Sequence, residues 1–149
     1  NDYIKNYKSI EPNTYFEFEN FIKNIVNKTE NNLYITTGLI SNKFITLIKN
    51  KFNKISEFKF ELNHNNKKII FLEKTNFFEL EYLVSKARLL ISCHGAATHV
   101  AAAFNIKIID IFDKSKILFY QKWTSHFRNY TNVERDNFKS LSSKIINIL

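Results

Sequence analysis

Apolar positions along this chain follow two periods, one typical of buried strands and one typical of helices. Short apolar runs predict strands at 33–37, 69–72, 89–92 and 106–112. Between them, apolar residues recur with helical spacing, and helices are predicted to begin near Thr14, Ser41 or Asn42, Asn76, Ala96, Asp113 and Asp136. Because strands alternate with helices, the sequence predicts an α/β, three-layer Rossmann-like domain with a mainly parallel sheet.

Other stretches are less regular. Residues 57–62 alternate and predict a short edge strand, His64 to Asn66 predict a turn, and 125–133 are an irregular aromatic and basic stretch. Residues 1–10 are predicted to be a linker or an arm. The length favours one domain over 1–149. Because the pattern begins with a helix, we expect a first strand and a partner domain to precede this segment.

The stretch 88–112 predicts a strand, a tight turn, a helix and a second strand. Gly95, one of two glycines, lies where the first strand ends, and 96–104 is a small apolar helix. In parallel sheets, ligands bind at the carboxyl ends of the strands. The free N–H groups of a helix N-terminus attract anions, above all phosphate. We therefore expect an anion site around Gly95.

Composition narrows the functional classes. The apolar fraction of 44% suffices for a core, and no run could span a bilayer or serve as a signal peptide. A single cysteine excludes an internal disulfide and fits a reducing compartment. The net charge of +8 comes from lysines scattered over helix faces, and no nucleic-acid module is visible, so nucleic acid is not an expected partner.

The second half of the chain resembles the donor-binding, C-terminal domain of two-domain (GT-B) glycosyltransferases. In heptosyltransferases a Lys-Thr or Lys-Ser turn enters a helix that ends in Ala-Arg, as residues 72–92 do here. The heptosyltransferase pattern continues with Asp-Ser-Gly and a His three residues after the Gly. This chain has Cys93-His94-Gly95 instead, with Thr98 in the position of that His and His99 one place later.

His94-Gly95-Ala96 is more similar to the His-Gly-Ala turn of a second group, the capsule-type and O-linked N-acetylglucosamine or xylosyl transferases. The resemblance implies one half of a GT-B fold in a bacterial enzyme, with a nucleotide-sugar donor and a surface polysaccharide or glycolipid acceptor. It implies a general base on a missing acceptor domain, so the fragment alone would be inactive, and it implies no bound metal or other cofactor. The expected location is the cytoplasm; peripheral association with the inner face of the membrane stays open.

Several residues could carry this chemistry. Gly95, with the N–H groups of Ala96 and Ala97, would hold the diphosphate; the alternative is a tight turn without ligand. His94 is the candidate catalytic residue, donating to a phosphate oxygen as the sugar leaves, or else it is a structural group. Thr98 could also bond a phosphate, whereas His99 could instead cap or pack.

Other candidates follow neighbouring strands. Lys74 and Thr75 are placed for base or ribose contacts, although Lys74 could equally lie on a solvated loop, and Gly38 and Ser41 would line the cleft. Cys93 is most simply a buried small residue. No His, Cys and Asp cluster has metal-ligand spacing, although Asp110 and Asp113 could pair around a cation.

Two functions remain in view at this point. The first is the donor domain of a glycosyltransferase. The second is a non-catalytic α/β module that docks a partner through the basic, aromatic surface of residues 119–130.

Overall fold

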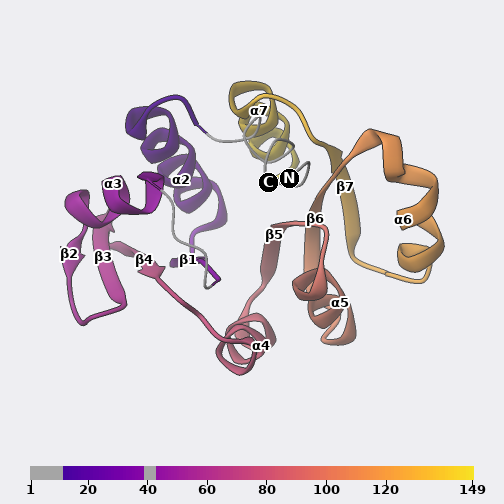
Figure 1. The fold of residues 1–149 in the computed structure, drawn as a ribbon, viewed down its shortest axis with the longest axis horizontal. Helices are drawn as coiled ribbons and strands as arrows, with labels where there is room; N and C mark the ends of the chain where they lie inside the picture. The colour runs from indigo at the N-terminus through magenta and orange to yellow at the C-terminus, as the bar shows by residue number, and fades with distance from the viewer. Residues whose placement is uncertain (1–11, 39–42) are drawn as a thin grey trace. The chain divides into compact units, whose positions relative to one another are not determined.

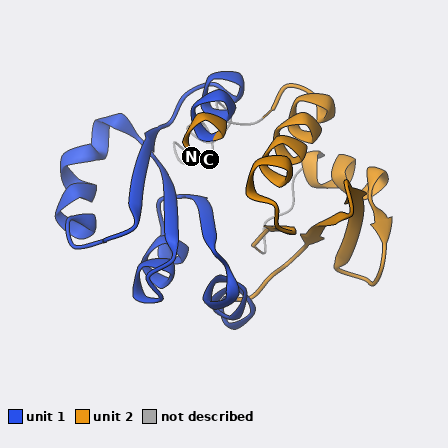
Figure 2. Ribbon diagram, turned by 180° about the vertical axis from the view of Figure 1, so that it is seen from behind, with its two compact units in different colours: residues 1–10, 77–145 blue, residues 11–76, 146–149 orange. Residues whose placement is uncertain are grey.

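The computed structural model describes residues 12–38 and 43–149 (Figure 1). The predicted arm at 1–10 and the predicted helix start at Ser41 and Asn42 lie outside these residues. The chain divides into two compact units, coloured separately in Figure 2. Unit 1 holds residues 77–145, and unit 2 holds the described part of residues 11–76 together with 146–149.

Unit 2 contains two helices and a four-stranded sheet. The helices are α2 (Tyr15–Thr29) and α3 (Lys43–Lys51), and the strands are β1 (Leu33–Thr36), β2 (Asn53–Lys54), β3 (Lys59–His64) and β4 (Lys67–Leu72). The start of α2 follows the prediction: the N–H of Glu17 donates to Oγ1 of Thr14 over 3.2 Å, which satisfies a free donor of the first turn.

The sheet of unit 2 has the order β1-β4-β3-β2, with β4 parallel to β1 and antiparallel to β3. The strand predicted at 57–62 is present as β3, but the prediction that it lies at the edge of the sheet was wrong, because β3 lies between β4 and β2. Asn65 and Asn66 adopt φ of 50° and 62°, the left-handed turn that folds β3 directly onto β4. The short β2 therefore takes the edge. Phe71, fully buried on β4, packs against the rings of Phe52 and Phe60 in the core.

Unit 1 contains three strands and four helices, with a short 3₁₀ turn. In chain order they are α4 (Phe77–Lys86), β5 (Leu89–Cys93), α5 (Ala96–Ala103), β6 (Lys107–Phe112), η2 (Lys114–Lys116), α6 (Ile117–Thr124), β7 (Tyr130–Glu134) and α7 (Phe138–Ile148), whose last three residues are assigned to unit 2. Its sheet has the order β5-β6-β7 and is parallel throughout. Val84 of α4, Ala101 of α5 and Ile108 of β6 form a buried cluster that joins these helices to the sheet. The fold class is α/β and Rossmann-like, as predicted.

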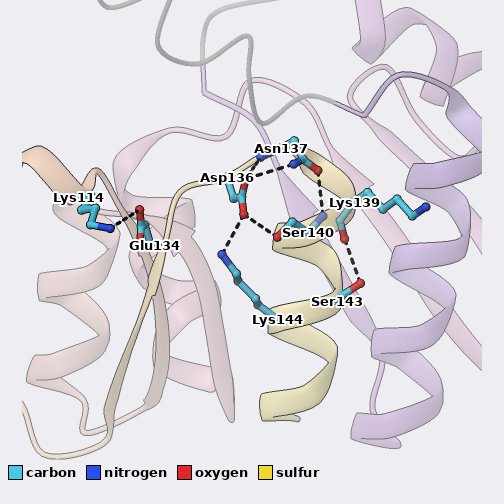
Figure 3. Close-up of polar contacts among 8 residues, drawn as sticks. All are labelled: Lys114, Glu134, Asp136, Asn137, Lys139, Ser140, Ser143 and Lys144. Carbon is cyan, nitrogen blue, oxygen red and sulfur yellow. Dashed lines mark hydrogen bonds and ion pairs between the residues drawn. The ribbon is translucent and has the colours of Figure 1, made fainter.

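Three details of unit 1 differ from the sequence-based prediction. The stretch at 125–133 is not wholly irregular, because β7 begins at Tyr130 and pairs with β6. β5 is half-buried rather than buried on both faces, because it is an edge strand of its three-stranded sheet. Asp136 shares the start of α7 with Asn137, whose side chain accepts the Ser140 N–H over 3.0 Å (Figure 3).

No helix in residues 12–38 or 43–149 is both long enough and apolar enough to cross a bilayer.

Candidate functional site

The parallel register of unit 1 gathers polar side chains on one face of its sheet. Ser92 on β5 lies opposite Asp110 on β6, which in turn lies opposite Asn132 on β7. Side chains two residues apart on a strand share a face, so His94, just past β5, and Tyr130, at the start of β7, are diagonal neighbours of Asp110. The N-terminal turn of α5 follows directly from this row.

Asp110 is the centre of the cluster and is completely buried. Its Oδ2 lies 2.6 Å from Nδ1 of His94 and accepts the Tyr130 hydroxyl over 2.7 Å. Its Oδ1 accepts the Thr98 hydroxyl over 3.3 Å. A buried carboxylate is costly unless hydrogen-bond donors surround it. Here three side chains from β5–α5 and β7 supply them.

His94 is held in one orientation by three contacts. Its backbone N–H donates to the carbonyl of Ile111 over 3.0 Å, which extends the β5–β6 ladder past Cys93. Its ring lies 4.1 Å from the ring of Tyr120, measured between centroids. Because Nδ1 faces the Asp110 carboxylate, it carries a proton, and Nε2 is the nitrogen left for a ligand. The side chain is 10% exposed.

Aromatic rings enclose this polar cluster. The rings of His94 and His99 have centroids 5.6 Å apart, His99 and Phe127 5.4 Å, and Phe127 and Tyr130 5.6 Å. Burial raises the pKa of Tyr130, and its hydrogen bond to Asp110 raises it further. The hydroxyl of Tyr130 is therefore a permanent donor to Asp110 at neutral pH.

The turn between β5 and α5 is open enough to admit a side chain. Gly95 has extended backbone, with φ of 173°. A Cβ at this position would lie 3.8 Å from the carbonyl oxygen of Cys93, which is an ordinary van der Waals contact. The turn itself therefore does not require glycine. Ala96 is exposed and Ala97 is half-buried at the first turn of α5.

Thr98 and His99 occupy different environments on α5. Thr98 is completely buried, its N–H donates to the carbonyl of Gly95 over 3.0 Å, and its hydroxyl donates to Asp110. A direct contact between this hydroxyl and a phosphate would require that bond to be exchanged. His99 is exposed, with one edge of its ring against His94.

Charged groups follow the carboxyl ends of β6 and β7. Arg135 comes directly after β7, and its backbone N–H donates to the carbonyl of Phe112 over 2.8 Å. Lys114 and Glu134 form an exposed ion pair at 3.6 Å (Figure 3). Hydrogen bonds from Ser115 lower the pKa of Asp113. Burial raises the pKa of the Cys93 thiol, against the opposing effect of Arg135, which favours the protonated thiol over the nucleophilic thiolate.

The other predicted residues belong to unit 2. Lys74 and Thr75 follow β4, where the Thr75 N–H donates to the carbonyl of Thr37 over 2.9 Å and the Lys74 N–H lies 3.4 Å from its hydroxyl oxygen. Gly38, next to Thr37, is exposed. The structure thus brings Lys74 and Thr75 together with the end of β1. Ser41 lies outside the described residues.

Sequence reasoning missed the link between His94, Asp110 and Tyr130. It considered Asp110 only as a partner of Asp113 around a cation. The available signal was the acid itself: a carboxylate within the apolar run of β6 has to find donors. In the structure those donors are His94, Tyr130 and Thr98, while Asp113 bonds to Ser115.

Comparison with known proteins identifies one family. The sequence model of glycosyltransferase family 9 (heptosyltransferase) matches residues 51–146, a range that contains the whole cluster around Asp110. No curated protein and no solved structure matches the chain. The predicted resemblance to heptosyltransferases is therefore confirmed, and the resemblance to the His-Gly-Ala group stays a prediction.

Proposed function

The chain belongs to glycosyltransferase family 9, the heptosyltransferase family, and we propose that it binds the nucleotide-diphosphate sugar donor of the transfer reaction. The observation that carries this proposal is the fixed His94 at the carboxyl end of β5, directly before the N-terminus of α5. With both ring nitrogens protonated, His94 would offer an Nε2–H donor and positive charge to a diphosphate, beside the N–H groups of the helix N-terminus.

The roles divide between backbone and side chains. The N–H groups of Ala96 and Ala97 would contact phosphate oxygens, and the absence of a side chain at Gly95 would let those oxygens approach closely. This gives a reason for a glycine that the turn itself does not require. Thr98 and Tyr130 would act through Asp110, because their hydroxyls bond to its carboxylate.

His94 would act on the charge that develops during transfer. As the bond from the sugar to the diphosphate breaks, its electron pair stays on the phosphate oxygen and negative charge grows there. Protonated His94 can donate Nδ1–H to Asp110 and Nε2–H to that oxygen. Asp110 fixes the ring and stabilises the imidazolium, whereas the ring of Tyr120 limits its rotation.

The wider setting follows from the resemblance. We propose a bacterial GT-B enzyme in which a second domain supplies the acceptor site and the general base, so that this chain alone binds donor without transferring sugar. The acceptor would be a surface polysaccharide or a glycolipid made in the cytoplasm, at the inner face of the membrane. Lys74, Thr75 and Gly38 are proposed contacts of the base or ribose.

Thermal unfolding with UDP, GDP, ADP and CMP tests donor binding. One of these nucleotides, at about a hundred times its dissociation constant, should add about 2.7 kcal/mol to the free energy of unfolding. Gly95→Val should abolish this shift with modest loss of stability, because a Cβ at Gly95 has room in the free protein. His94→Ala should weaken nucleotide binding about tenfold or more, since a hydrogen bond to a charged group is lost.

The control is His64→Ala, which removes a histidine from β3 in unit 2 and should leave nucleotide binding unchanged. If no nucleotide shifts the unfolding of the wild-type chain, the donor site is refuted, and the non-catalytic docking module becomes the better explanation. If Gly95→Val binds normally, the diphosphate does not lie at this turn.

A further inference from the structure

The outer face of α6 presents large apolar side chains to solvent. Leu118 is 75% exposed, Phe119 60% and Trp123 57%, and the rings of Phe119 and Trp123 have centroids 6.4 Å apart. The opposite face of the helix is turned inward, where Tyr120 contacts His94 and Thr124 is buried. We call Leu118, Phe119 and Trp123 the apolar ridge.

The stretch of sequence that carries this ridge contains basic residues and no acidic residue. Between Asp113 and Glu134 the sequence contains no Asp or Glu, although it contains four basic residues: Lys114, Lys116, Lys122 and Arg128. All four are exposed, and among the ion pairs of the described residues Lys114 alone of the four takes part in one, with Glu134 at 3.6 Å. Lys122 lies on the ridge face itself, one turn after Leu118.

We propose that α6 docks the protein onto an anionic lipid surface. The ridge would enter the boundary between headgroups and acyl chains, where tryptophan and phenylalanine are favoured, while the lysines stay at the level of the anionic headgroups. The charges of this segment complement those of an anionic lipid surface, because all of its charged residues are basic and the protein as a whole has a net charge of +8.

A lipid surface fits this shape better than a folded protein partner. The ridge consists of three side chains that protrude from one short helix, an arrangement suited to shallow insertion into a deformable boundary. The inference does not depend on the proposed donor site. Docking through α6 would, however, place the proposed donor site close to the lipid surface, because Tyr120 on the inner face of the same helix contacts His94.

Trp123 is the only tryptophan of the chain, so intrinsic fluorescence reports on the ridge alone. Vesicles of phosphatidylglycerol with phosphatidylcholine should shift its emission to shorter wavelength, as the indole leaves water. Vesicles of pure phosphatidylcholine should give little shift, and added salt should reverse the effect. Titration with the anionic vesicles gives the affinity.

Matched variants distinguish binding through the apolar ridge from binding through the overall positive charge of the protein. Lys122→Gln should weaken vesicle binding about fivefold, since each lysine near such a surface contributes roughly 1 kcal/mol. Phe119→Ala should weaken it roughly tenfold through lost apolar burial. The controls are Lys54→Gln on β2, with the same change in charge, and Phe78→Ala on α4, with the same loss of an exposed ring. Both should bind like the wild type.

Four outcomes would overturn the proposal. The first is an unchanged Trp123 emission with anionic vesicles. The second is equal weakening by Lys122→Gln and Lys54→Gln, which would reduce the binding to general charge. The third is a blue shift that depends on protein concentration without lipid, which would assign the ridge to a second copy of the chain. The last is a blue shift with heparin or RNA but not with vesicles, which would assign it to another polyanion.

Discussion

The carboxylate of Asp110 lies in the middle of an apolar strand and is tied to three side chains. His94, Tyr130 and Thr98 all place a hydrogen-bonding group against it. A buried ion of this kind contributes little to stability as long as its partners are present, yet removing one partner is costly because the charge remains buried. Substitutions of the three partner side chains therefore test this network better than a substitution of Asp110 itself.

Tyr130→Phe should lower the free energy of unfolding at neutral pH by about 1–3 kcal/mol, because Asp110 loses one donor. It should also change the response to alkali. The pKa of Tyr130 is raised in the folded state, so above its ordinary value of about 10 only the unfolded state loses the proton. The free energy of unfolding therefore falls as the pH rises beyond 10, and it should fall less in the Tyr130→Phe variant than in the wild type. Urea unfolding at a series of pH values measures both effects.

Tyr15 has to be considered in the same experiment. Its pKa is raised to about 12, first by burial and then by Glu19, so it adds to the alkaline loss of stability, and Tyr15→Phe should reduce that loss as well. Tyr82→Phe, on an exposed tyrosine of α4, controls for removal of a hydroxyl. An alkaline slope that is identical in the wild type and in Tyr130→Phe would show that this phenol does not stay protonated as described.

The sequence predicted part of this cluster. It placed His94 and Gly95 at a strand-to-helix turn, because a short apolar run meets an alanine-rich helix. It did not place Asp110 and Tyr130 beside them. These residues lie 16 and 20 positions from their partners in the network, and only the parallel register of β5, β6 and β7 brings them together. Such a register is a property of the folded sheet.

At the level of elements, the apolar runs were correctly predicted as strands, whereas the alternating stretch was predicted as a strand in the wrong place in the sheet. β4 and β6 were predicted because several successive residues in each are buried. β7 was missed because of its five residues only Val133 is fully buried, so it lacks an apolar run. β3 was predicted, but as an edge strand. Its alternation reflects a strand with one buried face, which an antiparallel hairpin can place inside a sheet.

The start of α7 allows a prediction at this scale. The pKa of Asp136 is lowered to about 2 by the hydroxyl of Ser140, then by Lys144 and the N–H of Asn137 (Figure 3). A carboxylate with a depressed pKa contributes stability above its ordinary value near 4 and loses it as the pH falls toward 2. Asp136→Asn should therefore lower stability at pH 7 and reduce its loss in acid.

Thermal unfolding between pH 7 and about pH 2 measures this contribution. The network is exposed to solvent, so the difference between wild type and Asp136→Asn should shrink as salt is added. Asp113→Asn, at the 3₁₀ turn before α6, is the matched control, because Asp113 is a carboxylate with a lowered pKa that lies outside α7. A pH profile of Asp136→Asn that runs parallel to that of the wild type would contradict the prediction.

At the scale of the whole molecule, the family assignment and the cluster reinforce each other. The family match covers residues 51–146 and so includes the three strands and the helices of unit 1 together with most of the strands of unit 2. The candidate residues divide between the two units: His94 to His99 lie in unit 1, and Gly38, Lys74 and Thr75 lie in unit 2. In the proposed two-domain enzyme the acceptor site and the general base lie on a second domain, so catalysis has to be tested in a preparation that contains both domains.

In a preparation that transfers sugar, His94→Ala should lower kcat far more than it raises KM. Negative charge on the leaving diphosphate grows as the bond to the sugar breaks, so a donor fixed by Asp110 matters most in the transition state. Loss of one such donor typically costs roughly two to three orders of magnitude in rate. Steady-state kinetics separates this role from simple binding: a raised KM at constant kcat would assign His94 to the ground state, and unchanged values of both would make it only a support of the turn. Tyr120→Phe, which keeps the ring beside His94, should leave both parameters close to those of the wild type.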